Sequence, residues 1–297
     1  MSNPAHAHRK GLLITLTGVL FIVPDALFVR LIGGDALVTA FWRSLICGTL
    51  ILLGVLATQG CAGLRPLARM GMPGWFYLAV VGFAGLGFVM AVAHTSVANV
   101  VFILASMPIF AAIFSRLLLK ELITRRTAIT IACVLMGLGL VAHGSSASAV
   151  ANWRGDLWAL AIAVSYGAGL SAARMVKEHA LVITVPVAYG ALALVLLALC
   201  DPWSSFAQHA PLYLAHGTFM AVATSLLTLG PRYLSAPEVA LLFLLESVLS
   251  PLLVWWVMGE NPGHWALLGG AVVVTTLLVS NWLAVQREAQ PPTRSTA

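Results

Sequence analysis

The sequence predicts an all-α polytopic membrane protein with ten transmembrane helices, arranged as two inverted repeats of five helices. Three observations lead to this fold class. Of the 297 residues, 60% are hydrophobic and only 9% are charged, with a mean hydropathy of +0.97, whereas a soluble domain carries roughly a quarter charged residues. The apolar residues form continuous runs of about 20, the length of one spanning helix. The basic residues are distributed unequally between the loops that connect these runs.

The spans are read from the apolar runs between polar loops. The ten predicted spans are 11–32, 36–57, 74–94, 97–119, 127–145, 155–174, 181–200, 211–231, 238–258 and 264–285. Because the runs are continuous rather than alternating at every second residue, they indicate helices and exclude a membrane β-barrel. No stretch of the sequence remains that could form a separate soluble domain.

The basic residues support this count independently. Under the ten-helix arrangement, twelve Lys and Arg residues fall on one side of the membrane, and only Arg30 and Arg154 fall on the other. The twelve are Arg9, Lys10, Arg65, Arg69, Lys120, Arg125, Arg126, Arg174, Lys177, Arg232, Arg287 and Arg294. Because basic residues accumulate in cytoplasmic loops, both chain termini are expected in the cytoplasm. A wrong number of helices would have mixed the two groups.

The two halves of the chain resemble each other in sequence. The segment "HTSVANVVFILASMPIFAAIFSRLLLKEL" aligns with "YLSAPEVALLFLLESVLSPLLVWWVMGEN", which sets Glu121 beside Glu260. A second alignment, of "GLLITLTGVLFIVPDALFVRLI" with "GDLWALAIAVSYGAGLSAARMV", sets Arg30 beside Arg174. Because five is an odd number, the second copy must enter the membrane from the opposite face. An inverted repeat of this kind places the substrate site near the midplane, between the copies.

Two longer segments carry a resemblance to a known family. The run "TSVANVVFILASMPIFAAIFSRLLLKELITRRTAITIACVLMGLGLV" resembles the EamA domain of the drug/metabolite transporter superfamily, in which a proline-containing fourth helix precedes a glutamate and a glycine-bearing fifth helix. The run "SAPEVALLFLLESVLSPLLVWWVMGENPGHWALLGGAVVV" resembles the same domain again. The resemblance extends over about residues 11–285 and implies ten helices in two inverted repeats, a central cavity and usually export of small metabolites or drugs. The chain departs from the family at "FIVPDALF", which replaces a Trp-rich start, and at Ser247, which aligns with Pro108.

The expected organisation follows from the spans and the repeat. It comprises a cytoplasmic N-terminal tail at 1–10, a first EamA-like repeat at 11–145, a linker at 146–154, a second repeat at 155–285 and a cytoplasmic C-terminal tail at 286–297. We expect a multi-pass integral protein of the bacterial inner membrane.

Asp25 and Arg43 are ionisable residues within predicted spans, where an unpaired charge is costly. Asp25 lies nine residues before the centre of the connecting loop, near residue 34, and Arg43 lies nine residues after it. With a rise of about 1.5 Å per residue, two antiparallel helices would place both side chains at one depth, roughly 10 Å below the outer surface. They can therefore form a buried ion pair. The pair either holds two helices together or lines the cavity and binds a charged or zwitterionic substrate, in which case Asp25 can also carry a proton.

Glu246 lies near the middle of the ninth predicted span, in "LLFLLESVLSP". A carboxyl group in such an apolar segment is a candidate for carrying a coupled proton and for lining the central cavity. Ser247 adds polarity beside it and is a candidate substrate contact. The alternative is a neutral acid that hydrogen-bonds between helices.

Three aromatic residues are further candidates for substrate binding, with packing as the competing interpretation: Trp42, Tyr166 and Tyr189. His216 can titrate near neutral pH, but the sequence does not decide its role. Arg30 lies near the end of a span, so we expect its charged group to reach the membrane interface.

Four prolines lie within predicted spans: Pro24, Pro108, Pro186 and Pro251. Proline lacks the backbone donor and kinks a helix, and neighbouring helices can satisfy the backbone groups that it leaves free. Kinks at these positions would favour the rocking motions of alternating access.

The sequence favours a secondary-active transporter that exports small organic metabolites, amino-acid-like compounds or drugs, with proton coupling through Glu246 or Asp25 as one option. A facilitative uniporter or channel-like permease is the alternative. An intramembrane enzyme is less favoured because the sequence has no H-E-x-x-H or G-x-S-x-G motif. The sequence also lacks the P-loop G-x-x-x-x-G-K-[ST], so nucleotide hydrolysis is not expected to drive transport.

We expect no cofactor and no metal, because the four cysteines have no metal-binding spacing. They are Cys47, Cys61, Cys133 and Cys200. The expected partners are a small-molecule substrate and the lipid bilayer, without nucleic acid. A monomer is compatible with the sequence.

Overall fold

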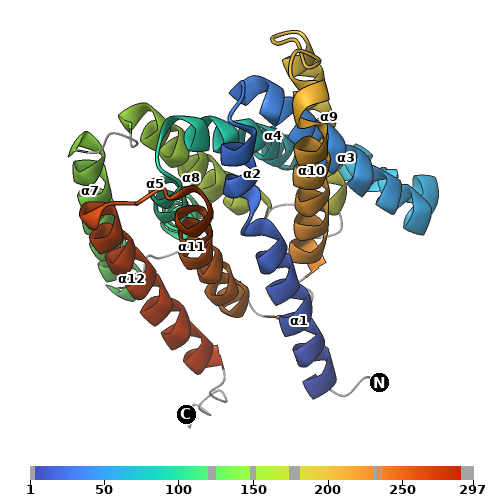
Figure 1. Ribbon diagram of the computed structural model, residues 1–297. Helices are drawn as coiled ribbons and strands as arrows, with labels where there is room; N and C mark the ends of the chain where they lie inside the picture. Colours follow the sequence, from blue (N-terminus) through green and yellow to red (C-terminus); the bar gives the residue numbers. More distant parts are fainter. Residues whose placement is uncertain are drawn as a thin grey trace, which may run out of the picture.

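A computed structural model describes residues 4–119, 125–147, 152–173, 181–229, 233–234 and 236–288, and helices make up its secondary structure in these ranges (Figure 1). The helices of the first half are α1 (Pro4–Ile22), α2 (Asp25–Ile32), α3 (Ala36–Gln59), the 3₁₀ helix η1 (Gly60–Arg69), α4 (Gly71–His94), α5 (Val97–Leu104), α6 (Met107–Leu119) and α7 (Arg125–Ala147). Those of the second half are α8 (Trp153–Ala173), α9 (Leu181–Leu197), α10 (Phe206–Leu229), α11 (Ala236–Met258) and α12 (His264–Glu288).

Every predicted span corresponds to one helix or to one pair of consecutive helices. The first span is α1 with α2, the fourth is α5 with α6, and each remaining span is a single α-helix. Within the described residues, seven helices are long and apolar enough to cross a membrane, and shorter apolar helices occupy Ile183–Leu197 and Leu242–Met258. The predicted fold class, an all-α polytopic membrane protein, is therefore confirmed. Helices α1 and α10 begin before their predicted spans, because apolarity marks the hydrocarbon region and not the ends of a hydrogen-bonded helix.

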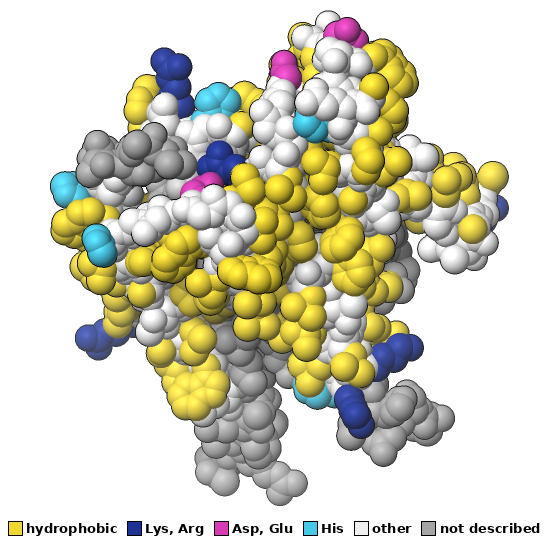
Figure 2. Space-filling view, in the orientation of Figure 1, with side chains coloured by type: hydrophobic (Ala, Val, Ile, Leu, Met, Phe, Trp, Pro, Cys, Tyr) yellow, Lys and Arg dark blue, Asp and Glu magenta, His cyan; other side chains and the backbone are white. Residues whose placement is uncertain are grey.

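The surface of the helices is consistent with lipid as the solvent. Figure 2 shows a face covered largely by hydrophobic side chains, with few charged ones. Large apolar residues are strongly exposed at several positions, and Trp256 of α11 is 85% exposed. Contiguous apolar surface of this extent is rare on soluble monomers, so these side chains lie against the bilayer.

The first span is broken at Pro24, as predicted. Helix α1 ends at Ile22 and α2 begins at Asp25, because proline has no N–H group to continue the hydrogen-bond ladder. The Pro24 carbonyl still accepts a hydrogen bond from the N–H group of Phe28 at 2.9 Å. The break gives α2 an N-terminus of its own inside the span. Asp25 occupies the first turn of α2, where the helix dipole stabilises a carboxylate.

The other prolines behave differently from one another. The fourth span breaks at Ser106, two residues before Pro108, and the Ser106 hydroxyl donates a hydrogen bond to the carbonyl of Ile103 at 2.6 Å. Helices α9 and α11 run through Pro186 and Pro251 without a break. Helix breaks therefore occur at or beside two of the four prolines.

The contacts between the two halves follow an approximate two-fold relation. In the repeat, α1 is equivalent to α8, and α4 is equivalent to α10. Helix α1 packs on α10, and α8 packs in the same way on α4. Likewise, α3 packs on α10 and α9 packs on α4, while the counterpart pairs α3 with α9 and α7 with α12 pack directly. Figure 1 shows the first turn of α1 and the last turn of α12 at the same end of the bundle, with α7 beside α12. Two repeats of five helices related in this way form an inverted repeat.

Two residues of the repeat alignment, Glu121 and Arg174, lie outside the described residues. Their sequence counterparts, Glu260 and Arg30, are described and contact each other at the end of the bundle opposite the termini. The predicted domain boundaries stay a prediction.

Glycines allow α7 and α12 to approach closely. A Cβ atom added at Gly269 would lie 2.5 Å from the carbonyl oxygen of Gly137, and one added at Gly137 would lie 2.9 Å from the carbonyl oxygen of Gly269. Small residues let membrane helices pack backbone against backbone, where dispersion contacts replace the hydrophobic effect that operates in water. This contact joins the last helix of each repeat.

We predict that Gly137→Ala lowers the free energy of unfolding by about 1–3 kcal/mol, as overpacking of a tight contact does. Gly139→Ala is the matched control on the same helix, because a Cβ atom there would meet nothing within 4 Å. Thermal unfolding of both variants in detergent micelles measures the difference. Equal melting temperatures for the two variants would contradict the close α7–α12 contact.

Candidate functional site

A buried ion pair joins α2 to α3 in the interior of the bundle. Arg43 donates from Nε to Oδ1 of Asp25 at 3.0 Å and from Nη2 to Oδ2 at 2.8 Å. Each side chain is only 4% exposed. The two parallel hydrogen bonds match the planar guanidinium to the carboxylate. The ion pair expected from the equal depth of the two residues is confirmed.

His216 of α10 is the third member of this arrangement. Its Nε2 atom lies 2.5 Å from Oδ1 of Asp25, and its side chain is fully buried. The ring of Phe28 stacks on the imidazole, with 5.4 Å between the ring centroids. The sequence left the role of His216 undecided because 191 residues separate it from Asp25. The second repeat thus contributes directly to the ion pair of the first.

Aromatic residues surround the guanidinium of Arg43. Its Cζ atom lies 5.8 Å from the ring centroid of Tyr189 on α9 and 5.7 Å from that of Phe88 on α4, within the range of a cation–π interaction. Tyr166 of α8 is half-buried and close enough to Tyr189 and Arg43 to interact with both electrostatically. The structure therefore places both predicted tyrosines beside the ion pair.

Glu246 of α11 belongs to the same region. Its side chain is half-buried, and it lies close enough to Asp25 for the two carboxyl groups to interact electrostatically. Within the described ranges, no side chain hydrogen-bonds to the Glu246 carboxyl or forms an ion pair with it. We use the name central cluster for Asp25, Arg43, His216 and Tyr189, which contact one another, together with Tyr166 and Glu246, which interact with them electrostatically.

Trp42 lies in an aromatic cluster next to this site. Its indole Nε1 donates a hydrogen bond to the carbonyl of Pro202 at 2.8 Å, and its side chain is buried. Three aromatic rings pack around it: Trp203, Phe206 and Tyr213. These contacts hold α3 against the connection between α9 and α10. A role of Trp42 in substrate binding stays a prediction.

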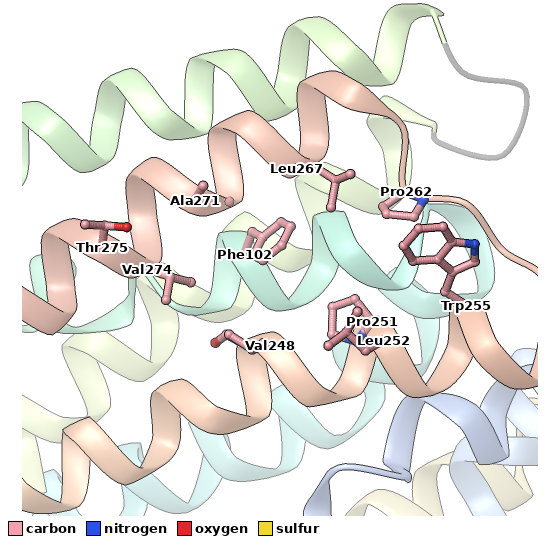
Figure 3. A pocket seen from close by; sticks show the side chains of 12 residues that line it. Phe102, Val248, Pro251, Leu252, Trp255, Pro262, Leu267, Ala271, Val274 and Thr275 are labelled. Carbon is pink, nitrogen blue, oxygen red and sulfur yellow. The ribbon is translucent and has the colours of Figure 1, made fainter.

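Ser247 lines a separate groove of about 200 Å³ between α11 and α12. Figure 3 shows Phe102 of α5 between α12, which carries Ala271 and Leu267, and α11, which carries Pro251 and Leu252. Consecutive residues of a helix point about 100° apart, so Ser247 and its neighbour Glu246 face different surroundings. The contact of Ser247 with substrate stays a prediction.

Arg30 lies in the last turn of α2, where it forms an ion pair, and its predicted location at the membrane interface stays a prediction. Its Nε atom lies 2.8 Å from Oε2 of Glu260, and its Nη2 donates to the carbonyl of Thr95 at 2.8 Å. Glu260 also accepts a hydrogen bond from the N–H group of Val97, the first residue of α5, at 2.8 Å. The sequence indicates how deep Arg30 lies, but it does not reveal that the loop after α11 folds over it.

A second set of hydrogen bonds connects α8 to Thr95 and to Asn99 of α5. Asp156 accepts from the Thr95 hydroxyl at 2.7 Å and from the side-chain amide of Asn99 at 3.1 Å. The inter-repeat clamp, as we name it, comprises Arg30, Thr95, Asn99, Asp156 and Glu260. It joins the two repeats at the end opposite the chain termini.

Metal binding finds no support in the part of the chain that the structure describes, where no group of three or more His, Cys, Asp or Glu side chains could hold an ion. The central cluster instead offers a cation, two carboxyl groups, an imidazole and phenol rings. Groups of this kind can bind a small organic ion and a proton.

Two repeats of membrane-spanning helices that enclose a buried charged cluster define a multi-pass membrane transporter. The model of the EamA-like transporter family matches residues 9–142 and 153–282, and the chain therefore belongs to this family, with one domain in each repeat. The resemblance seen in the sequence is confirmed, and the chain is a membrane transporter of the drug/metabolite transporter superfamily.

The structural comparison agrees with this fold. One solved crystal structure superposes with a TM-score of 0.60 at 22% sequence identity, covering 95% of this chain and 100% of its own. At this identity the likeness concerns the fold alone. A search of curated proteins finds no significant match.

We predict that Asp25→Leu and Arg43→Met each lower the free energy of unfolding by about 3–5 kcal/mol, because each leaves an uncompensated buried charge. The double variant removes both charges and should lose much less than the sum of the two single effects. Unfolding of the four proteins in detergent micelles completes the double-mutant cycle. Additive losses would show that the two residues do not stabilise each other.

Proposed function

We propose that the protein is a secondary-active transporter that exports small organic metabolites, amino-acid-like compounds or drugs from the cytoplasm by alternating access. The observation that carries this proposal is the central cluster, because helices of both repeats contribute to it. In transporters built from inverted repeats, the substrate binds at such an interface near the midplane. His216 and Glu246 lie near the middle of α10 and α11, which supports a site at this depth.

The composition of the central cluster favours a zwitterionic or charged substrate. Arg43 offers a fixed cation to a carboxylate, and Glu246 offers a carboxyl group that has no partner within the described ranges. Tyr166 and Tyr189 add aromatic surface with hydroxyl groups for an organic side chain. An amino-acid-like compound would match all three features. Asp25 and Glu246 are the groups through which a proton could be coupled.

The inter-repeat clamp supports alternating access. It closes the bundle at the end opposite the termini through contacts between the repeats. The breaks beside Pro24 and Pro108 lie in helices of the first repeat, where they provide points of bending. Opening the clamp while closing the other end would expose the central cluster to the opposite side.

The orientation follows from the charges of the loops. The excess of Lys and Arg on the side of the termini supports a cytoplasmic location for both ends, in the bacterial inner membrane. The clamp then faces the outside. The protein is proposed to act as a monomer in the lipid bilayer, on a small-molecule substrate.

A facilitative uniporter or channel-like permease is the second candidate. The burial of Asp25, Arg43 and His216 favours a carrier, because side chains that are at most 4% exposed do not line a continuous aqueous pore. Flux through a carrier saturates with substrate, whereas flux through a pore rises with concentration over a wide range.

Reconstituted proteoliposomes test these alternatives. We predict saturable uptake of at least one compound from a panel of radiolabelled amino acids, organic cations and organic acids, measured with and without a pH gradient. Flux that rises linearly with concentration would identify a pore. A protein that moves no compound of the panel would contradict the transporter proposal for these substrates.

We further predict that Glu246→Gln lowers the transport rate about tenfold or more, the equivalent of a lost charge-assisted hydrogen bond of about 1.5–3 kcal/mol. The matched control is Asp201→Asn, an exchange of carboxylate for amide in an exposed loop residue, which should leave the rate unchanged. Melting temperatures of both variants confirm the fold. An unchanged rate in Glu246→Gln would exclude Glu246 from the substrate and proton pathway.

A further inference from the structure

Two buried polar atoms of the central cluster have no hydrogen-bond partner among the described residues: Nη1 of Arg43 and Nδ1 of His216. Both side chains are more than nine-tenths buried. Buried polar groups in native proteins are nearly always paired, so each exception requires an explanation. Each atom belongs to a group that already contacts Asp25 through its other nitrogens, and each retains the capacity for one more hydrogen bond, which a ligand that reached the cluster would supply.

The charge balance of the cluster depends on the protonation of His216. With a neutral imidazole, Nε2–H donates to Asp25, Nδ1 carries a lone pair, and the charges of Asp25 and Arg43 cancel. A proton on Nδ1 turns this atom into a donor and leaves one net positive charge in the interior. That charge is costly unless an anion lies beside it.

We infer that His216 takes up one proton together with an anionic group of the substrate, so that the central cluster binds a carboxylate and a proton as a pair. The carboxylate would accept hydrogen bonds from Nη1 of Arg43 and from the protonated Nδ1 of His216. This inference rests on the proposed transport function and names the charged group of its substrate. Because each ligand favours the binding of the other, the coupling is reciprocal.

The surroundings of His216 contain few groups that could take this proton instead. The charged side chains that interact with His216 from the packed helices are Asp25 of α2 and Arg43 of α3, and two titratable groups, Cys47 of α3 and Tyr189 of α9, interact with Arg43 in turn. Helix α10 itself carries His209 and Tyr213, and α1 has no titratable side chain between Lys10 and its end at Ile22. Glu246 of α11 interacts electrostatically with Asp25, the residue that His216 contacts. The remaining candidate for a proton carrier is therefore Glu246.

Transport of the carboxylate together with a proton determines which gradients drive the flux. A zwitterionic substrate and the proton together carry one positive charge. A substrate whose only charge is the carboxylate instead crosses with the proton without net charge, so the membrane potential does not act on this pair. The direction of flux then follows the sum of the substrate gradient and the pH gradient. Export proceeds when the inside concentration of the substrate outweighs the proton gradient.

Isothermal titration calorimetry with benzoate as the carboxylate probe tests this inference on the purified protein. Titrations in phosphate and in Tris, which differ in ionisation enthalpy, report the number of protons taken up for each benzoate bound. We expect close to one proton in the wild type above neutral pH, and an affinity that falls about tenfold for each unit of rising pH. Benzylamine, which carries the opposite charge on the same ring, should take up no proton through this site.

The variant His216→Gln keeps a hydrogen-bond donor for Asp25 but cannot titrate, and His216→Asn is a second amide variant in case the first one unfolds. Benzoate should still bind to them, with close to zero protons taken up and no dependence on pH. Asp201→Asn, at an exposed residue outside the central cluster, should keep the proton uptake of the wild type, and Glu246→Gln tests whether Glu246 holds the proton instead. A purely structural role of His216 would leave proton uptake unchanged in the amide variants.

The outcomes separate the inference from the proposed function. Absence of saturable benzoate binding to the wild type, or binding without proton uptake, overturns the inference. Proton uptake that persists in His216→Gln and disappears in Glu246→Gln overturns it as well and assigns the proton to Glu246. Proton-linked binding in a protein that transports nothing in proteoliposomes would instead refute the transport function and leave the site intact.

Discussion

The burial of Asp25 and Arg43 against each other is the interaction on which the interior of this transporter depends. Neither charge could lie in the hydrocarbon region alone, and two hydrogen bonds between them offset the cost. Pro24 assists because it starts a new helix at Asp25, whose carboxylate then lies at a helix N-terminus. The pair fixes α2 beside α3 and creates a polar centre that draws in His216 from the other repeat.

The polar contacts of the molecule gather at two levels that serve different purposes. At the inter-repeat clamp, Arg30 and Glu260 join the repeats where the helices end, through an ion pair and through hydrogen bonds to the backbone of Thr95 and Val97. In the central cluster, Arg43 and His216 each retain a polar atom without a partner. Satisfied polar networks rigidify a structure, whereas unsatisfied buried atoms mark places where a ligand completes the set.

The part of the site that could be predicted from the sequence is the part that depends on neighbouring helices. Asp25 and Arg43 flank one short loop, so counting residues from its centre was sufficient to place them at the same depth. Counting residues from a loop could not predict the contact of His216 with Asp25, which is 191 residues away, or the contact of Arg30 with Glu260. Ser247 is adjacent to Glu246 in sequence but lines the groove between α11 and α12, because adjacent helical residues point in different directions.

By itself the sequence determined that this chain crosses the membrane as ten helical spans in two repeats, because the length of apolar runs and the placement of basic residues are local properties of a chain in a bilayer. It also determined that an acid and a base meet between the first two spans. Only the tertiary structure decided which side chains of the second repeat join them, since that depends on how ten apolar helices pack. The sequence of an apolar helix does not indicate which other apolar helices it packs against. The polar residues at the centre therefore find their partners only when the two repeats pack together.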